Sequence, residues 1–283
     1  MSESVKAGNR SLGKLLQLVC TTYGIDFSRY RFTCVGRRVS HRMTTLGYSD
    51  LEEYMEFLRE NPGEMDALLN AVTIHVTGFF RDKEVFDSLS RIVLPRIVER
   101  KLAGKSRSIR IWSAGCSTGE ETYSLAVLFT YLLNQQGHAI NLEVFGTDIS
   151  EESCRIARKG VYPKQKLADM PVRMKVRYFD VVEEGFQASP EIRRLVKFRV
   201  HDLFSAPPYS MLDLVVCRNV MIHFDHNARG NIIMNFNNVL VDGGILILGK
   251  SEAVTGDELE LFDMVDPRSK VYRKRSRIQG GTV

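Results

Sequence analysis

The spacing of apolar residues in the first part of the chain predicts a helical domain. Between residues 11 and about 70, apolar positions recur every three or four residues, the period of an amphipathic helix, without strand-like alternation. The positions that carry this period are Leu12, Leu15, Leu16, Val19, Val35, Val39, Met43, Leu51, Tyr54, Met55 and Leu58. We therefore assign residues 1–90 to an N-terminal all-helical domain, followed by a linker helix over residues 91–107.

From Ser108 the pattern changes to continuous apolar runs that alternate with amphipathic segments. The runs read RIWSAG, LEVFGTDI, VKFRVHD, LDLVVCRN and GGILILGKSE. Helices are predicted between them over residues 120 to about 133, 150–160 and about 227–240. Strands that are apolar along their whole length are typical of a mostly parallel sheet with helices on both faces. The sequence therefore predicts an α/β domain over residues 108–283.

One segment of the α/β region is too long for a simple connection. Residues 162 to about 197 carry Pro163, Pro171 and Pro190 and contain the stretch VRYFDVVEEGFQAS. Long connections in compact domains usually contain structure of their own. We expect a small inserted β-subdomain there, built from short helices and one hairpin.

The composition indicates the cellular compartment and excludes some classes of protein. The chain has 283 residues, 44% of them hydrophobic, and five scattered cysteines without a C-x-x-C pair. That usage argues against a disulfide framework and against a metal site. The N-terminus has no secretory pattern, and no apolar run approaches the roughly 18 residues that a membrane span requires. We expect a cytoplasmic monomer that does not insert into a membrane.

The distribution of charge says more than the net value of +5. The segment SRYRFTCVGRRVSHR, residues 28–42, carries five arginines and no acidic residue, whereas residues 50–60 are rich in Asp and Glu. The C-terminal stretch RSKVYRKRSR is basic again. We interpret that stretch as a solubilising tail, because charge runs are most often solvated surface.

Polar residues that could form a site follow the predicted strands. In a doubly wound sheet, ligands bind beyond the carboxyl ends of the strands. The turn AGCSTGEE follows the first strand, and Gly115 and Gly119 allow a tight bend there. The turn lacks both the G-x-G-x-x-G order of a dinucleotide site and the Gly-Lys-Ser/Thr of a P-loop. Instead, Glu120 and Glu121 stand at the helix N-terminus, where a phosphate would usually bind.

Two carboxylates at that position would repel a pyrophosphate but suit a cationic ligand that has no phosphate. S-adenosylmethionine, with its ammonium and sulfonium groups, is such a ligand. Asp148, at the end of the second strand, is placed to bond ribose hydroxyls. Each acid taken alone has an ordinary explanation as a residue of a helix first turn or of a turn. Their occurrence at successive strand ends favours an S-adenosylmethionine site and disfavours a dinucleotide oxidoreductase.

Several blocks of the sequence resemble the CheR-like chemotaxis receptor glutamate methyltransferases. In chain order they read RRVSHRM, TIHVTGFFRD, IWSAGCSTGEETYSLA, FGTDISEESCRIARKGVY, LDLVVCRNVMIHFD and GGILILGKSE. The resemblance covers nearly the whole chain. It implies a Rossmann-like S-adenosylmethionine-dependent methyltransferase sheet. It also implies an enzyme that converts glutamate side chains on the cytoplasmic helical domain of membrane chemoreceptors into methyl esters, releasing S-adenosylhomocysteine.

The resemblance further implies which residues form the site. The expected cofactor-binding residues are His75, Thr77, Arg81, Glu120, Glu121, Asp148, Asp202, Leu203, Arg218 and Asn219. Arg81 is also our candidate for a catalytic role, in orienting the carboxylate that is methylated. Which of the two glutamates contacts the cofactor stays open. His75 and His223 stand where the family often has Asn and Tyr; both can hydrogen-bond, and a structural role is as reasonable as a functional one.

The basic N-terminal segment gives the expected substrate surface. Arg31, Arg38 and Arg42 are seven and four residues apart and would share one face of a helix. Together with His223, we expect them to bind an acidic receptor helix; without the resemblance, a solvated face would be the default interpretation. Some family members grip a receptor's C-terminal peptide with a Gly-rich hairpin loop. The corresponding turn here has Gly185 alone, so no C-terminal pentapeptide tether is expected.

Two other functions stay open from the sequence. The fold and the basic segments would fit a nucleic-acid methyltransferase. The chain has no N-P-P-Y or Pro-Cys motif and no interleaved aromatic and basic surface, so no nucleic-acid partner is expected. The other alternative is a non-catalytic relative that binds S-adenosylmethionine as a scaffold or sensor, because the matching residues indicate binding more than turnover.

Overall fold

The computed structural model describes residues 3–23, 26–72, 77–104 and 106–276, which form two compact units. Unit 1 contains the described residues up to Val72 together with His223–Ala228, and unit 2 contains the others. This division differs from the expected one, which placed residues 77–90 in the helical domain and made residues 91–107 a linker. Apolar residues of this stretch, among them Val85, Val93 and Ile97, are buried in the same core as the sheet strands, so the stretch belongs to unit 2.

Unit 1 has the all-helical structure that the apolar spacing predicts. Its helices are α1 (Glu3–Tyr23), α2 (Phe32–Leu46), α3 (Leu51–Glu60) and α4 (Pro62–Val72), with a 3-10 turn at Phe27–Arg29. The residues at the predicted apolar positions are buried together, among them Leu15, Val19, Val35, Val39, Tyr54 and Leu58. The segment His223–Ala228 joins this unit through a bridge between Tyr30 and Phe224 and a bond from the Arg31 amide to the His223 carbonyl.

Gly36 lies inside helix α2, where glycine is usually unfavourable. A Cβ at this position would lie 3.0 Å from the Leu12 side chain. The glycine therefore allows α1 and α2 to pack closely, which explains its presence in a helix interior.

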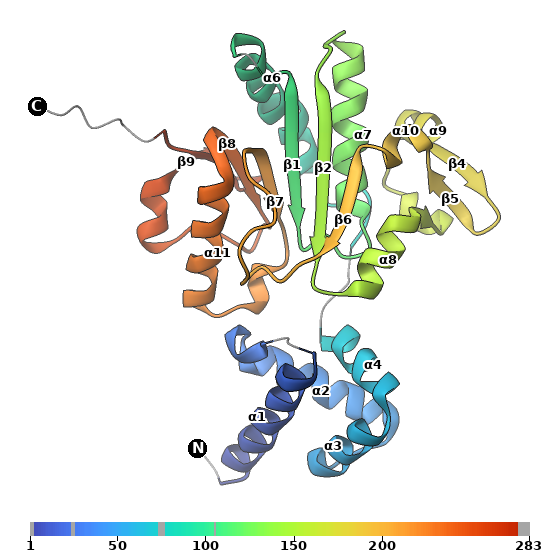
Figure 1. The fold of residues 1–283 in the computed structure, drawn as a ribbon, viewed down its shortest axis with the longest axis vertical. Helices are drawn as coiled ribbons and strands as arrows, with labels where there is room; N and C mark the ends of the chain where they lie inside the picture. The colour runs from blue at the N-terminus through green and yellow to red at the C-terminus, as the bar shows by residue number, and fades with distance from the viewer. Residues whose placement is uncertain (1–2, 24–25, 73–76, 105, 277–283) are drawn as a thin grey trace, which may run out of the picture. The chain divides into compact units, whose positions relative to one another are not determined.

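Unit 2 is built on a seven-stranded sheet in the order β6-β2-β1-β7-β8-β10-β9 (Figure 1). The strands are β1 (Ser108–Ala114), β2 (Asn141–Asp148), β6 (Val196–Val200), β7 (Leu212–Cys217), β8 (Leu240–Leu248), β9 (Phe262–Asp266) and β10 (Val271–Lys274). Strands β6, β2, β1, β7 and β8 pair in parallel, and β10 is antiparallel to β8 and β9. The predicted α/β class is confirmed. The carboxyl ends of β1, β2, β6 and β7 meet at one edge of the sheet.

The basic stretch near the C-terminus contains a sheet strand, so its interpretation as a solubilising tail was wrong. Strand β10 pairs with β8 on one side and β9 on the other, and both Val271 and Tyr272 are buried. The neighbouring cations are held locally, since Arg273 binds Asp263 and Lys274 donates to the carbonyl of Leu240. Two buried side chains between basic residues were too short a signal to identify this strand.

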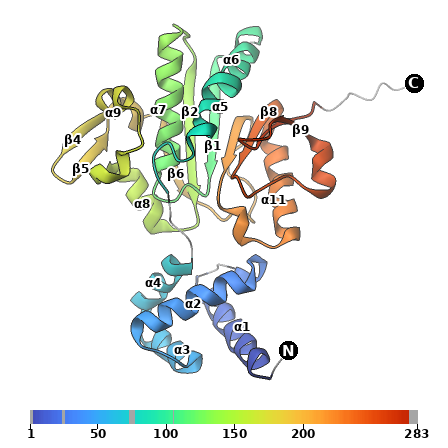
Figure 2. The same cartoon turned by 180° about the vertical axis from the view of Figure 1, so that it is seen from behind.

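Helices cover both faces of the large sheet. Helices α5 (Lys83–Ser88), α6 (Leu94–Ala103) and α7 (Glu120–Gln135) lie over one face (Figure 2), and α11 (His226–Val239) lies over the other (Figure 1). Helix α8 (Glu151–Lys159) connects β2 to the inserted segment. A short π-helical turn, Leu89–Val93, joins α5 to α6. On the α11 face, Trp112 packs edge-on against Phe236, with ring centroids 5.4 Å apart.

The inserted segment forms the small antiparallel sheet expected from its length and turns. Its strands are β3 (Val161–Tyr162), β4 (Phe179–Val182) and β5 (Gly185–Ala188), in the order β3-β5-β4. The short helices are α9 (Val172–Tyr178), α10 (Pro190–Arg193) and a 3-10 turn at Lys164–Leu167. Gly185 has a φ of 137°, and a Cβ there would collide with the Tyr162 carbonyl oxygen, so the hairpin requires glycine at this position.

Candidate functional site

The turn after β1 is a tight, glycine-dependent bend fastened to the end of β2. Gly115 and Gly119 have φ values of 76° and 95°. The amides of Gly115 and Cys116 both donate to the Thr147 carbonyl at 2.8 Å. A Cβ on Gly119 would lie 2.8 Å from the Ala157 Cβ, so helix α8 packs directly against the turn. The acidic start of α7 is therefore held in a fixed position beside the end of β2.

The two glutamates at the start of α7 bind different cations. Glu120 is fully buried; its Oε1 lies 3.0 Å from the Lys166 ammonium, and its Oε2 accepts from the Thr118 hydroxyl at 2.6 Å. Glu121 accepts from the Ser113 hydroxyl at 2.8 Å and from Arg218 Nη1 at 3.2 Å. Both carboxylates thus belong to internal ionic networks, which the sequence did not reveal.

Both networks hold the segment that carries Thr77 and Arg81. Lys166, the partner of Glu120, also donates to the Thr77 carbonyl at 3.0 Å. Arg218, the partner of Glu121, binds the Asp82 carboxylate as well. Sequence analysis did not identify Lys166 or Asp82. Asp82 stands inside a block that carried the family resemblance, but no local pattern marks Lys166.

The segment around Arg81 has a strained backbone. Phe80 and Asp82 have φ values of 52° and 63°, and such left-handed conformations of non-glycine residues cost roughly 1–3 kcal/mol each. The Phe80 amide donates to the Ser124 hydroxyl at 3.0 Å, and Asp82 is held by Arg218 and by Lys250 at 3.2 Å. These bonds stabilise the bend.

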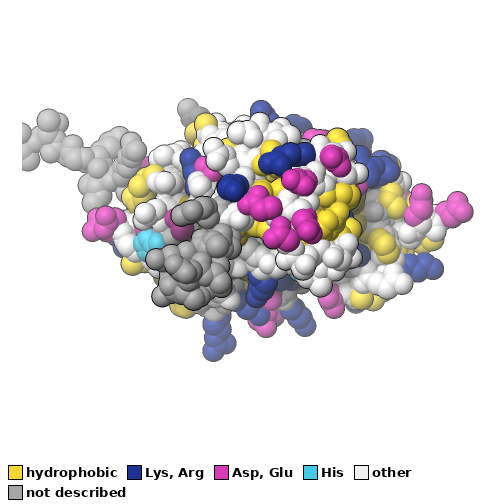
Figure 3. Space-filling model, turned by 90° about the horizontal axis from the view of Figure 1, so that it is seen from below, with side chains coloured by type: hydrophobic (Ala, Val, Ile, Leu, Met, Phe, Trp, Pro, Cys, Tyr) yellow, Lys and Arg dark blue, Asp and Glu magenta, His cyan; other side chains and the backbone are white. Residues whose placement is uncertain are grey.

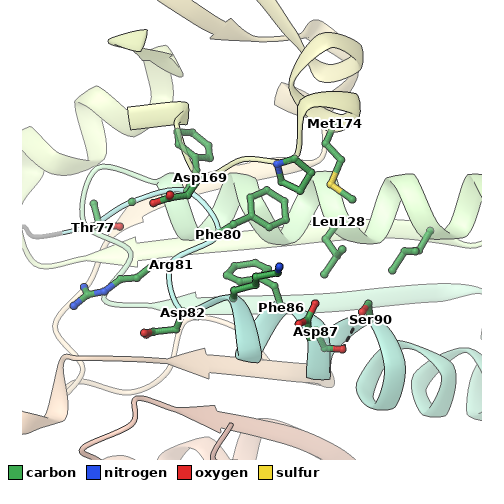
Figure 4. Close-up of a pocket in the computed structure, with 15 residues that line it drawn as sticks. Thr77, Phe80, Arg81, Asp82, Phe86, Asp87, Ser90, Leu128, Asp169 and Met174 are labelled. Atoms are coloured by element: carbon green, nitrogen blue, oxygen red, sulfur yellow. Dashed lines mark hydrogen bonds between the residues drawn. The ribbon is translucent and has the colours of Figure 1, made fainter. Parts of the chain in front are cut away.

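A cavity of about 710 Å³ lies beside this segment. Its lining is mainly apolar, with Phe80, Phe86, Leu128 and Met174 among the contributing residues. Figure 4 shows Thr77 and Arg81 toward one end of the cavity, with the Arg81 guanidinium pointing away from Leu128 and Met174. The other expected cofactor residues in the described part of the chain do not line this cavity. They lie instead along the carboxyl edge of the sheet.

Asp148 occupies the expected place at the carboxyl end of β2. It is 9% exposed, and its two oxygens accept from the amides of Ser117 at 2.8 Å and Ser150 at 3.0 Å. The His201 amide donates to the Asp148 carbonyl at 2.9 Å, which ties the end of β6 to the same place. A carboxylate has room for about four hydrogen bonds, so Asp148 keeps acceptor capacity for a ligand's hydroxyl groups.

The remaining expected cofactor residues follow β6 and β7. The Asp202 carboxylate accepts from the Phe204 amide at 3.0 Å, and Leu203 is 9% exposed. Asn219 has a left-handed φ of 59° directly after β7. The Arg218 side chain is 2% exposed, and its ion pairs with Asp82 and Glu121 give it a structural role inside the site. His75 lies outside the described residues.

The expected substrate residues lie in unit 1, and they do not form one uniform basic face. Arg42 forms a bidentate bond to Glu64, at 2.8 Å from Nε and 2.5 Å from Nη2, and the Tyr54 hydroxyl binds the same carboxylate at 2.8 Å. Arg38 donates to the Ala71 carbonyl at 3.1 Å. The charge of Arg42 is therefore neutralised inside the unit, in contrast to that of Arg38.

Arg38 and His223 are electrostatically linked. Burial lowers the pKa of His223 to about 4, with smaller contributions from the positive charges of Arg38 and Arg31. Burial, with the nearby charge of Arg37, also lowers the pKa of Arg38. A second cavity, of about 320 Å³, is lined by Arg37, Arg38, His41, Arg42, Thr45 and Ala71. Unit 1 thus contains a recess with a concentration of positive charge.

Several acidic side chains lie close together on one face of the molecule. In Figure 3, a group of Asp and Glu side chains is visible near the centre, with Lys and Arg side chains next to it and further acidic side chains elsewhere on this face. Within unit 1, helix α3 carries exposed acids, namely Glu52, Glu53, Glu56 and Glu60, whereas α2 carries the arginines. The basic recess is therefore a property of α2 and not of the whole unit. None of the helices that the structure describes is long and apolar enough to cross a membrane.

Comparison with known proteins identifies both units. Residues 75–271 match the family described as "CheR methyltransferase, SAM binding domain", and residues 10–73 match "CheR methyltransferase, all-alpha domain". A chemotaxis protein methyltransferase of Borreliella burgdorferi is 31% identical over 87% of this chain and 89% of that one. The chemotaxis protein methyltransferase 2 of Pseudomonas aeruginosa is 33% identical over 81% of each chain.

Among solved structures, a TehB-like SAM-dependent methyltransferase from Corynebacterium glutamicum matches 69% of this chain and 92% of that one, at 17% identity. The TM-score of this match is 0.36.

Proposed function

Because the chain belongs to the CheR methyltransferase family, we propose that it methylates glutamate side chains on the cytoplasmic helices of chemoreceptors, in chemotaxis adaptation. It is an S-adenosylmethionine-dependent methyltransferase. The observation that carries the proposal is that the two family domains follow one another in order over residues 10–73 and 75–271. A nucleic-acid methyltransferase or a cofactor-binding scaffold has no comparable support.

The carboxyl edge of the sheet fits this cofactor better than it fits a dinucleotide. The turn after β1 presents buried carboxylates where a pyrophosphate would need free amides and a cation. Asp148 would hold the ribose hydroxyls, and Asn219, Asp202 and Leu203 would surround the adenine side. Glu120 and Glu121 would give the negative potential that suits an ammonium and a sulfonium. When bound, the cofactor supplies an electrophilic methyl group.

The residues of this chain have to position the reactants and keep water out. A substrate glutamate, with an ordinary pKa of about 4.3, is already ionised at neutral pH, so no general base is required. Carboxylate and sulfonium neutralise each other during the reaction, and a site drier than water favours that transition state. Arg81 would orient the carboxylate, held in place by the strained segment that Arg218 and Lys166 fasten.

The proposed substrate surface is helix α2 with its basic recess. Arg37, Arg38 and Arg31 would attract the acidic receptor helix, with His223 beside them. Arg42 supports this surface by fixing Glu64 and Tyr54. Strands β4 and β5 are joined by only Glu183 and Glu184, which supports the expectation that there is no receptor-tail tether. We further propose a cytoplasmic monomer.

The deciding experiment is transfer of labelled methyl groups to purified receptor cytoplasmic fragments, followed by mild base. We expect label on the protein and its release by base as methanol, which is diagnostic of a carboxylate ester. A receptor fragment with Gln in place of its candidate Glu residues serves as the matched control and should take up no label. Base-stable label, or label transferred to nucleic acid instead of protein, would refute the proposal. Cofactor binding without any transfer would favour the scaffold alternative.

A further inference from the structure

Glu252 carries a buried carboxylate directly after β8, and it is not among the residues expected to form the site. The residue is 4% exposed. Oε1 accepts from the amides of Val220 at 3.0 Å and Ile222 at 3.2 Å. Oε2 accepts from the amides of Asn219 at 3.0 Å and Gly249 at 2.6 Å. One carboxylate thus binds four backbone donors, three of them in the loop after β7.

In the described part of the chain, the hydrogen bonds of the Glu252 carboxylate are to backbone amides. Burial raises the pKa of its carboxyl, and the backbone donors act in the opposite direction. Among the residues that the structure describes, no Lys, Arg or His forms an ion pair with it. Burying a carboxylate without such donors would be costly, so this interaction fixes the loop conformation as well as the carboxylate.

The loop that Glu252 holds is linked to two parts of the proposed cofactor site, the turn after β1 and the segment that carries Arg81. Asn219 is in the left-handed conformation, with a φ of 59°. Val220 packs against the turn after β1, since a Cβ on Gly115 would lie 2.5 Å from its Cγ2. Arg218, directly before the loop, binds Glu121 and Asp82. The position of this loop therefore affects the acidic turn and the Arg81 segment together.

Gly249 is part of the same arrangement. A Cβ at this position would lie 2.6 Å from Glu252 Oε2 and 2.8 Å from the Asn219 amide nitrogen. Any side chain would have to push the carboxylate and the loop apart. Glycine is required here by close approach, not by backbone conformation.

We propose that Glu252 is a positioning residue for the cofactor site, which holds Asn219 and the backbone of residues 219–222 in the conformation that binds S-adenosylmethionine. The inference rests on the proposed role of Asn219 in binding the cofactor. Among the described residues, Glu252 accepts hydrogen bonds from backbone amides, and it acts through the loop.

The test compares S-adenosylhomocysteine binding by calorimetry in wild type, E252Q and D213N. Glutamine is nearly isosteric, but its single oxygen can serve only one pair of amides, and its NH2 group would face the other two. We expect E252Q to weaken binding at least tenfold and to raise the KM for S-adenosylmethionine, with kcat at saturation within about twofold of wild type.

D213N is the matched control because Asp213 is a buried carboxylate near the start of β7, the strand that precedes the loop held by Glu252. It accepts from the Arg110 amide at 2.9 Å and pairs with Arg100 at 2.6 Å, far along the strand from Asn219. D213N should lower the melting temperature at least as much as E252Q but leave cofactor affinity unchanged. If both variants weaken binding equally, or if E252Q binds like wild type, the positioning role is refuted.

Two further variants, G249A and N219A, separate failure of the positioning role from failure of the proposed cofactor site. G249A should also weaken binding at least tenfold, through the steric contact and without loss of the carboxylate; normal binding by G249A would contradict the proposal even if E252Q did not fold. N219A tests the premise. If N219A binds S-adenosylhomocysteine like wild type, the proposed site is wrong and the positioning role falls with it. If N219A is defective and E252Q is normal, only the role of Glu252 fails.

Discussion

Two charged regions of the molecule differ in whether their charged side chains have partners of opposite charge. At the carboxyl edge of the unit 2 sheet, three carboxylates have internal cationic partners: Glu120 binds Lys166, and Glu121 and Asp82 share Arg218. On helix α2 of unit 1, no carboxylate of the described residues pairs with Arg37 or Arg38. In the first region these ionic groups are paired before any ligand binds. In the second, Arg37 and Arg38 have no carboxylate partner among the residues that the structure describes.

The difference matches the two tasks that the proposed function assigns to these regions. A site that binds a small cofactor for chemistry benefits from groups fixed before binding, because less ordering is then required on binding. A surface that attracts a macromolecule benefits from charge that its partner neutralises, and such charge acts mainly on association and selectivity. Changes to the first region should therefore affect stability and cofactor affinity, and changes to the second should affect the substrate alone.

The largest expected effect is on the stability of unit 2 in R218A. Removing this arginine leaves the Glu121 carboxylate, 14% exposed, without its cation, and the Asp82 carboxylate, 24% exposed, with Lys250 alone. We expect the free energy of unfolding to fall by about 3 kcal/mol, measured by denaturant titration. R155A is the control, since its ion pair with Glu152 is exposed and should contribute less than about 1 kcal/mol. Equal losses in the two variants would show that the buried network has no special role.

The next effect is on cofactor affinity in D148A. The variant loses the acceptor of the Ser117 and Ser150 amides and the proposed partner of the ribose hydroxyls. We expect S-adenosylhomocysteine to bind about 2 kcal/mol more weakly, roughly thirtyfold, by calorimetry. D180A removes an exposed aspartate of strand β4 and should bind as wild type does. Unchanged affinity in D148A would remove the proposed ribose contact.

Sequence reasoning located the elements of unit 2 because their pattern is local. The strands at the centre of the sheet are continuous apolar runs, and topology alone brings their carboxyl ends to one edge, so Asp148 and the acidic turn could be placed together. Strand β10 has no such run. Its burial depends on β8 and β9 beside it, and those pairings cannot be read from a short basic stretch.

The partners of the site residues could not be predicted for the same reason. Glu121 and Arg218 are 97 residues apart in the chain and bind one another, and no local pattern of the sequence indicates that pairing. Likewise, the even spacing of Arg38 and Arg42 indicated one basic face, but Glu64 on another helix neutralises Arg42. Periodicity predicts which face a residue occupies; it does not identify the residue that meets it there.

An intermediate effect is the acid sensitivity that His223 gives to unit 1. Its folded-state pKa is about 4, below the unfolded value of about 6.5, so the folded chain binds fewer protons between these values. Its contribution to stability is therefore present above about pH 6.5 and is lost as the pH falls toward 4. Between pH 7 and pH 5, we expect the free energy of unfolding to fall by about 2 kcal/mol less in H223N than in wild type, measured by denaturant titration. H41N, which changes an exposed histidine, should follow wild type; parallel curves for wild type and H223N would contradict this assignment.

The smallest expected effect is on receptor methylation by the variant R37E/R38E, which tests the basic recess of helix α2 directly. Reversing two charges of the α2 recess should reduce kcat/KM for the receptor fragment about fivefold at low salt, because attraction to an acidic helix becomes repulsion. The loss should shrink at high salt, where exposed charges are screened, and S-adenosylhomocysteine affinity should not change.

R173E reverses an exposed arginine on helix α9 in unit 2 and is the control for net charge. If R173E reduces kcat/KM equally, the effect comes from total charge and helix α2 is not the docking surface; if R37E/R38E weakens cofactor binding, the separation between the two regions is wrong.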